Sequence, residues 1–225
     1  MARIKTALYS SLPGEKAHNI MAPRPKFIEG YEGIHSAPPI KSAVMILITP
    51  DENELAVPFI KRVNRGRYHA GQIALPGGKK EESDLNSIET ALRECYEEIG
   101  VPPEDISILG ILSDIYIPLS NYTISPVVGT VLKKPEFVLS PDEVEQIILV
   151  KMSELFNAAH KTTASFSRHA HEIVAPGYRI GEHFIWGATA MIISEMEQIL
   201  KDNTRTLHIT PVSPKTGRKT GDNRL

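Results

Sequence analysis

The sequence has few of the features that mark secreted, membrane or nucleic-acid-binding proteins. It contains one cysteine, Cys95, in 225 residues, which excludes an intramolecular disulfide framework and a multi-cysteine zinc site. Its longest uninterrupted apolar run is six residues, 43–48, whereas a membrane helix needs roughly 18 to 20. The N-terminus lacks a secretory hydrophobic segment, and the net charge of −2 gives no extended basic surface for nucleic acid. We therefore expect a cytoplasmic protein without a membrane or nucleic-acid partner.

The chain divides into three parts by composition. Residues 1–40 carry five prolines and three glycines without a sustained periodicity, which predicts an extended N-terminal arm. Residues 41–202 contain the segments with regular hydrophobic patterns, and we expect them to form one domain. Residues 203–225 are basic and lose hydrophobic periodicity, which predicts a disordered tail.

Local patterns in the central part predict a mixed α/β order. Apolar β-prone runs around turn residues at 50–53 predict a hairpin over 42–62, and glycine-rich residues 63–85 predict a long functional loop. A helix is expected from Asn86, a capping residue, to Gly100, a helix-stopping residue. Short β-type runs follow, then a short helix near Ser153 and a last helix over about 187–201.

Three carboxylates on the helix after the loop carry the chemical signal. Glu94, Glu97 and Glu98 are spaced i, i+3 and i+4, which predicts one acidic face. Such a run is most often a solvated surface. Here it follows a glycine-rich loop, and clustered carboxylates with phosphate oxygens suit a hard divalent cation. The helix places apolar residues on the opposite face, namely Ala91, Leu92, Cys95 and Ile99.

These residues resemble the signature of the Nudix hydrolases, G-x5-E-x7-R-E-U-x-E-E-x-G-U, where U is an aliphatic or similar residue. Residues 93–101, RECYEEIGV, match its second half without a break. In the first half, Asp84 stands at the acidic position after Gly78, and eight residues rather than seven separate it from Arg93.

A second motif, upstream of the first, is similar to that of the coenzyme A pyrophosphatase branch of the same family. That motif is close to L-L-T-x-R-[SA]-x3-R-x3-G-x3-F-P-G-G. The branch also has an Ile-Trp-Gly-x-Thr-Ala segment at its last helix, matched here from Ile185 to Ala190. The motif residues that fall at the required spacing are Arg62, Arg67, Gly71, Leu75, Pro76, Gly77 and Gly78.

The resemblance implies an α/β/α sandwich with a mixed sheet and a diphosphatase that uses Mg²⁺ or Mn²⁺. Glu94, Glu98 and Glu97, with the Gly78 carbonyl, would bind metal, and Arg93 would orient a glutamate. Arg62 and Arg67, with Gly77 and Gly78, would bind substrate, because guanidinium groups bind phosphates in bidentate geometry. The implied substrate is coenzyme A or its thioesters, hydrolysed to 4'-phosphopantetheine and adenosine 3',5'-bisphosphate.

Several alternatives stay open at this point. The substrate could instead be ADP-ribose, a nucleotide sugar or another nucleoside diphosphate derivative, and a non-catalytic nucleotide-binding module is a different class of function. Glu143 and Glu145 are the candidates for a general base. Many members of the family form dimers, which leaves a homodimer open. We interpret Cys95 and Trp186 as packing residues.

Overall fold

The computed structural model describes residues 2–9, 11–24, 35–64, 71–168 and 171–206. Its helices are α1 (Ala2–Leu8), α2 (Glu15–His18), α3 (Ser87–Ile99), α4 (Met152–Leu155) and α5 (Gly187–Thr206), with 3₁₀ turns η1 (Pro103–Asp105) and η2 (Ala158–His160). Its strands are β1 (Ile40–Asp51), β2 (Glu54–Arg62), β3 (Ile73–Ala74), β4 (Gly77–Lys79), β5 (Ser107–Ile111), β6 (Ile115–Ile117), β7 (Tyr122–Thr130), β8 (Val144–Lys151), β9 (Lys161–Arg168), β10 (His171–Ile180) and β11 (His183–Trp186). None of the helices in these ranges is long and apolar enough to span a membrane.

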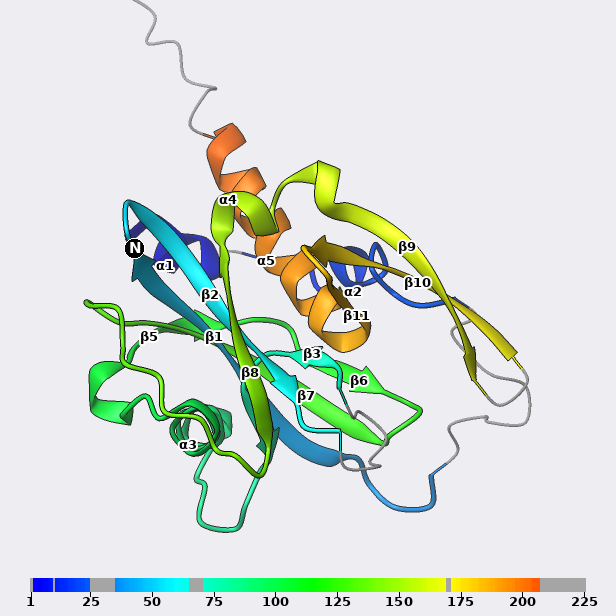
Figure 1. Ribbon diagram of the computed structural model, residues 1–225, viewed down its shortest axis with the longest axis horizontal. Coiled ribbons are helices and arrows are strands. Elements are labelled where there is room, and N and C mark those ends of the chain that lie inside the picture. The colour runs from blue at the N-terminus through cyan, green and yellow to red at the C-terminus, as the bar shows by residue number, and fades with distance from the viewer. Residues whose placement is uncertain (1, 10, 25–34, 65–70, 169–170, 207–225) are drawn as a thin grey trace, which may run out of the picture.

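A mixed eight-stranded sheet forms the centre of the fold. Its main order is β3-β2-β1-β7-β5, with β4 paired to β1, β6 to β7 and β8 to β2. The β1–β7 pair is parallel and the other pairs are antiparallel. Helices α3 and α5 lie on opposite sides of this sheet (Figure 1), which confirms the expected α/β/α sandwich. A separate antiparallel sheet, in the order β11-β10-β9, leads into α5.

Strand β1 is buried on both faces because its apolar run is continuous rather than alternating. Met45 and Leu47 belong to the core cluster on the α3 side of the sheet. Ile46 and Ile48 belong to the cluster on the α5 side. The two-residue period of a strand thus divides one hydrophobic segment between two cores.

The predicted hairpin over 42–62 is confirmed. Strands β1 and β2 pair antiparallel from Thr49–Ala56 to Asp51–Glu54. The connection is two residues long, and Glu52 has a positive φ of 51°. This short turn keeps β2 in register with β1, and β2 ends at Arg62, where the long loop begins.

The prediction of an extended N-terminal arm is wrong for two segments. Residues 2–8 and 15–18 are helical, and both helices pack against α5. Ile4, Ala7 and Leu8 are buried, so a short i, i+3, i+4 apolar pattern outweighs the proline-rich composition around it. Residues 25–34 of the expected arm lie outside the described residues.

The last helix is longer than predicted. It begins at Gly187, as expected, but continues to Thr206 rather than ending near Lys201. The first four residues of the predicted disordered tail are therefore helical. Residues 207–225 lie outside the described part of the chain.

Candidate active site

Helix α3 carries the predicted acidic residues and begins and ends at the predicted positions. The side chain of Asn86 accepts hydrogen bonds from Ile88 N at 2.9 Å and Glu89 N at 3.1 Å, which satisfies two free N–H groups of the first turn. Gly100 has a φ of 73° and its N–H donates to the Tyr96 carbonyl at 2.9 Å, as in a left-handed C-terminal cap. Because local caps fix both ends of α3, they also fix where its glutamates lie along the helix.

Two glycines let the loop approach the helix closely. A Cβ on Gly77, which has a φ of 155°, would lie 2.4 Å from the Ala43 carbonyl oxygen. A Cβ on Gly78 would lie 2.5 Å from Glu94 Oε1. Because any side chain at these positions would collide with strand β1 or with Glu94, glycine is required for the backbone to lie against the carboxylates.

Glu98 is a buried carboxylate that lacks full hydrogen bonding. Its side chain is 1% exposed, and Oε2 accepts a hydrogen bond from Gly77 N at 2.8 Å. Oε1 has no hydrogen-bond partner among the described residues, and Arg62 Nη1 lies 3.5 Å from it. Burial raises the pKa of Glu98 to about 8, and Arg62 and the Gly77 N–H oppose this shift. A buried carboxylate with an unpaired oxygen lowers the stability of the fold unless a cation compensates its charge, so such a group usually has a functional reason.

Arg93 connects four groups around the acidic cluster. Its Nε and Nη2 donate to Asp84 Oδ1 and Oδ2 at 3.1 and 3.0 Å, in the bidentate geometry that strengthens such pairs. Its Nη1 donates to Glu94 Oε1 at 3.0 Å and to Glu97 Oε2 at 2.9 Å, and Nη2 also donates to the Lys79 carbonyl at 3.0 Å. Arg93 therefore orients Glu94 and links it to Asp84 and Glu97.

Asp84 holds Arg93 in place despite the one-residue insertion between them. Its side chain is 5% exposed, and Oδ2 also accepts from Glu81 N at 2.9 Å. The hydrogen bonds from Arg93 lower the pKa of Asp84 to about 2, against the effect of burial. The sequence pattern singled out this acid but did not assign it a role.

The three glutamates do not share one exposed face. Glu94 is largely buried at 12% side-chain exposure, and burial raises its pKa while Arg93 opposes the rise. Glu97 is 54% exposed and bonded to Arg93, whereas Glu98 points inward beside Cys95. The reason is geometric, since successive helical residues are about 100° apart, so Glu97 and Glu98 diverge on either side of Glu94. A uniformly solvated acidic surface, the alternative interpretation, is wrong for Glu98.

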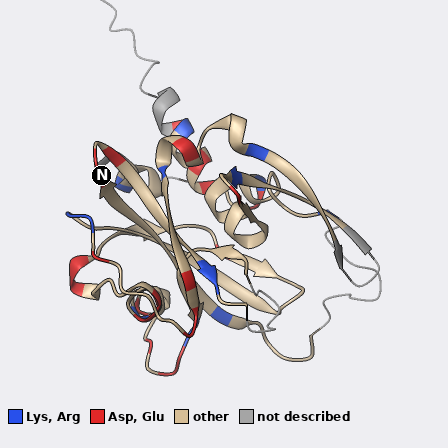
Figure 2. Ribbon diagram, in the orientation of Figure 1, with Lys and Arg blue, Asp and Glu red and all other residues tan. Residues whose placement is uncertain are grey.

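Among the other predicted substrate residues, Arg62 lies at the site and Arg67 lies outside the described residues. The backbone of Arg62 closes the base of the loop. Its N–H donates to the Gln72 carbonyl at 3.1 Å, and its carbonyl accepts from Gly71 N at 3.0 Å. The Arg62 side chain is thereby directed from the end of β2 towards Glu98. Figure 2 shows the basic end of β2 close to the acidic residues of α3 and β8.

The two candidate bases differ in their surroundings. Glu145 pairs with Lys61 at 2.6 Å. Glu143 is exposed, its carbonyl accepts from Val63 N at 3.0 Å, and its charge contributes to raising the pKa of both Glu94 and Glu98. The segment before it is tied to α3 by Ser140 N, which donates to the Glu98 carbonyl at 3.1 Å. Glu143 is therefore the better placed of the two.

Cys95 is fully buried between α3 and the sheet. Burial raises the pKa of its thiol to about 12, which suppresses the thiolate that a nucleophile needs. This agrees with its interpretation as a packing residue.

Comparison with known proteins identifies the family. Residues 39–171 match the family model described as the NUDIX domain. The chain is 34% identical over 138 residues to "Uncharacterized Nudix hydrolase NudL" of Pectobacterium atrosepticum, covering 60% of this chain and 70% of that protein. It is 29% identical over 152 residues to the NudL protein of Escherichia coli K12, covering 62% of this chain and 78% of that protein.

Solved structures share the fold. A MutT/nudix family protein from Enterococcus faecalis superposes with a TM-score of 0.51 and 19% identity, covering 75% of this chain and 64% of that one. A MutT protein from Methanosarcina mazei Go1 gives a TM-score of 0.50 and 18% identity, covering 76% and 99%.

The chain belongs to the Nudix family. It is a hydrolase of phosphoanhydride bonds. Enzymes of this family generally use divalent metal ions.

Proposed function

We propose that the protein hydrolyses the diphosphate bond of coenzyme A and its thioesters, releasing 4'-phosphopantetheine and adenosine 3',5'-bisphosphate. The position of Arg62 is the observation that carries this proposal. Arg62 belongs to the upstream motif similar to that of coenzyme A pyrophosphatases, and its guanidinium lies 3.5 Å from Glu98 in the family signature. The two motifs therefore meet at one site, where a guanidinium can bind a diphosphate beside the carboxylates.

The donor set fits a hard divalent cation, Mg²⁺ or Mn²⁺. Glu98 offers a buried oxygen without a hydrogen bond, and Glu94 lies against Gly78. Within the described residues, no three acidic, histidine or cysteine side chains converge as a complete ligand set. Mg²⁺ commonly takes only one or two carboxylates and completes its shell with waters and substrate phosphates. We assign Glu98 and Glu94 as the main ligands, with the Gly78 carbonyl and Glu97 as additional ligands.

The side chains around this set have separate roles in the proposed reaction. A bound cation would neutralise the diphosphate oxygens and lower the pKa of a bound water. Arg62 and Arg67 bind the diphosphate, and the backbone of Gly77 and Gly78 lets it approach. Arg93 keeps Glu94 oriented. Glu143 accepts the proton of the attacking water, because Glu145 is engaged by Lys61.

Product analysis tests the substrate. Purified protein is incubated with Mg²⁺ or Mn²⁺ and coenzyme A, acetyl-coenzyme A, ADP-ribose, NADH or UDP-glucose, each against an EDTA blank. We expect the highest kcat/KM for coenzyme A or acetyl-coenzyme A, with 4'-phosphopantetheine or its acyl form as a product. Higher kcat/KM for ADP-ribose or UDP-glucose would overturn the substrate while retaining the diphosphatase, and nucleotide binding without turnover would indicate a binding module.

A matched pair of variants tests the base. Glu143→Gln should lower kcat by about 10²-fold or more, the usual contribution of a general base. Glu145→Gln, two residues away on the same segment, should keep kcat within about twofold. Equal effects of the two substitutions would remove Glu143 from the mechanism.

A further inference from the structure

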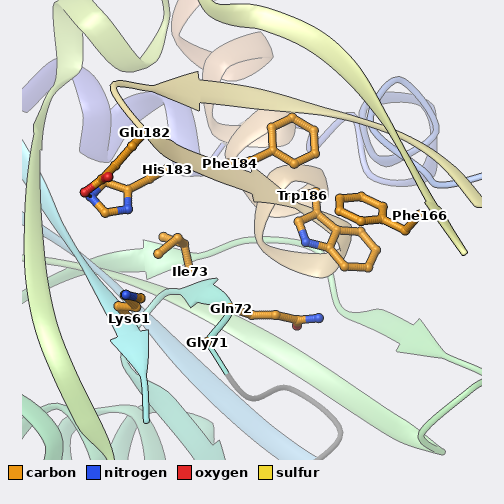
Figure 3. A pocket seen from close by; sticks show the side chains of 9 residues that line it. All are labelled: Lys61, Gly71, Gln72, Ile73, Phe166, Glu182, His183, Phe184 and Trp186. Carbon is orange, nitrogen blue, oxygen red and sulfur yellow. Dashed lines mark ion pairs between the residues drawn. The ribbon is translucent and has the colours of Figure 1, made fainter. Parts of the chain in front are cut away.

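A cavity of about 470 Å³ lies between the end of β2 and the small sheet β9–β11. Lys61 and Ile73 line one side, and Phe166, Phe184 and Trp186 line the other (Figure 3). This volume is within the usual range for small-molecule sites. The cavity contains none of the carboxylates described above.

One wall of the cavity is made of aromatic rings. Phe184 and Trp186 are two residues apart on β11 and therefore share a face. The Phe166 ring stacks on Trp186 with centroids 4.7 Å apart and planes at 24°, and it lies 6.0 Å from Phe184. Gly177 on β10 makes room for the wall, because a Cβ there would lie 2.8 Å from Phe184 Cζ.

The cavity adjoins the proposed diphosphate site at the end of β2. Lys61 lines the cavity, while the next residue, Arg62, reaches Glu98 on the other side of the strand. Their Cα atoms are about 3.8 Å apart in any chain. Gly71, which also lines the cavity, donates its N–H to the Arg62 carbonyl at 3.0 Å. A ligand whose diphosphate contacts Arg62 can therefore extend around the strand end into the cavity.

We propose that this cavity binds the nucleobase of the substrate. The inference rests on the proposed function, in which the substrate is a nucleotide diphosphate. Ring stacking favours a planar heterocycle over a flexible chain, because every base has a π-face and stacking on aromatics is strongly favourable. The Trp186 indole N–H has no acceptor among the described residues, so it is available to a ring nitrogen or carbonyl. Glu182 and His183 at the rim add polar groups for the edge of a base.

The single tryptophan of the chain makes the proposal directly testable. Trp186 is the only tryptophan, so intrinsic tryptophan fluorescence reports on this cavity alone. Metal-free protein is titrated with adenosine 3',5'-bisphosphate, with 4'-phosphopantetheine and with inorganic pyrophosphate. We expect saturable quenching by the bisphosphate and none by the other two ligands.

Variants distinguish the loss of ring stacking from a general loss of folded structure. Phe184→Leu should raise the Kd for adenosine 3',5'-bisphosphate roughly tenfold, and Phe184→Tyr, which keeps the ring, should restore it to within about twofold. Tyr9→Leu, at a 75% exposed aromatic residue just after α1 and outside the cavity, is the matched control and should leave the Kd unchanged. In steady-state assays Phe184→Leu should raise KM for coenzyme A more than it lowers kcat.

The outcomes distinguish this proposal from the proposed function. Quenching by 4'-phosphopantetheine instead of the nucleotide, or an unchanged Kd in Phe184→Leu, overturns the nucleobase assignment whatever the enzyme hydrolyses. Nucleotide quenching that depends on the Phe184 ring supports the assignment. If coenzyme A is then not hydrolysed, only the choice of substrate fails.

Discussion

Replacing Glu98 with glutamine should abolish catalysis and yet stabilise the metal-free protein at alkaline pH. The substitution keeps the shape of the side chain and removes its charge. The carboxylate is buried, and one oxygen has no hydrogen bond among the described residues. A charge in that position opposes folding unless a cation is bound.

The magnitude follows from the pKa of Glu98, which burial raises from 4.5 to about 8. A rise of about 3.5 units corresponds to roughly 5 kcal/mol as an upper figure. Water entry and relaxation reduce such values, so we expect a stabilisation of about 2–4 kcal/mol at pH 8. Because the folded state holds the proton more tightly, wild-type stability is full below about pH 4.5 and falls as the pH rises towards 8. Glutamine does not titrate, so the advantage of the variant should appear over this same window.

Thermal unfolding in EDTA between pH 5 and pH 8.5 measures the effect. For a chain of this size, the expected gain in Tm for Glu98→Gln at pH 8 is about 5–10 °C, and it should be close to zero at pH 5. Glu104→Gln, at an exposed carboxylate in η1, is the control and should change stability by less than about 0.5 kcal/mol at either pH. Added Mg²⁺ should stabilise the wild type more than the variant. A variant no more stable than wild type at pH 8, or a difference that does not change with pH, would refute this account of Glu98.

Other predictions concern the supports of the site. Asp84→Asn should lower stability by about 2–3 kcal/mol, since it breaks a charged bidentate pair with Arg93, and it should lower kcat. The pKa of Asp84 is depressed to about 2, so the stability from this pair is present above about pH 4 and lost as the pH falls towards 2; acid titration of unfolding should be flatter in the variant. Gly78→Ala should displace the Glu94 carboxylate, which leaves no space for a Cβ, and should reduce kcat/KM by at least about tenfold with little change in circular dichroism. Cys95 should resist thiol reagents in the native protein and react only after unfolding, because its thiol is buried with a pKa of about 12.

The sequence predicted those features that depend on neighbouring residues. The hairpin and the box helix follow from local turn, capping and periodicity signals, and Asn86 and Gly100 alone are enough to delimit the helix. The N-terminal helices were missed because each is short and is stabilised by packing on α5 rather than by its own propensity.

The site was predictable in its residue types but not in its electrostatics. Helical spacing groups Glu94 with Glu97 and Glu98, yet it cannot tell that Glu98 is buried against Gly77, which begins strand β4 and precedes Glu98 by 21 residues. The aromatic cavity depends on contacts between β3, β9 and β11, which are far apart in the chain. An i, i+2 repeat of aromatics at Phe184 and Trp186 was its only local signal.

The charges of the site support the assignment of a divalent cation independently of the family signature. Four carboxylates, those of Asp84, Glu94, Glu97 and Glu98, are balanced by the guanidinium groups of Arg93 and Arg62. When all are ionised, two negative charges remain, which is the charge that one divalent ion neutralises. Arg93 is shared among Asp84, Glu94 and Glu97, and Arg62 lies 3.5 Å from Glu98, so two guanidinium groups serve four carboxylates beside Gly77 and Gly78. Asp84 contributes by holding the Arg93 guanidinium with two hydrogen bonds, at 3.1 and 3.0 Å.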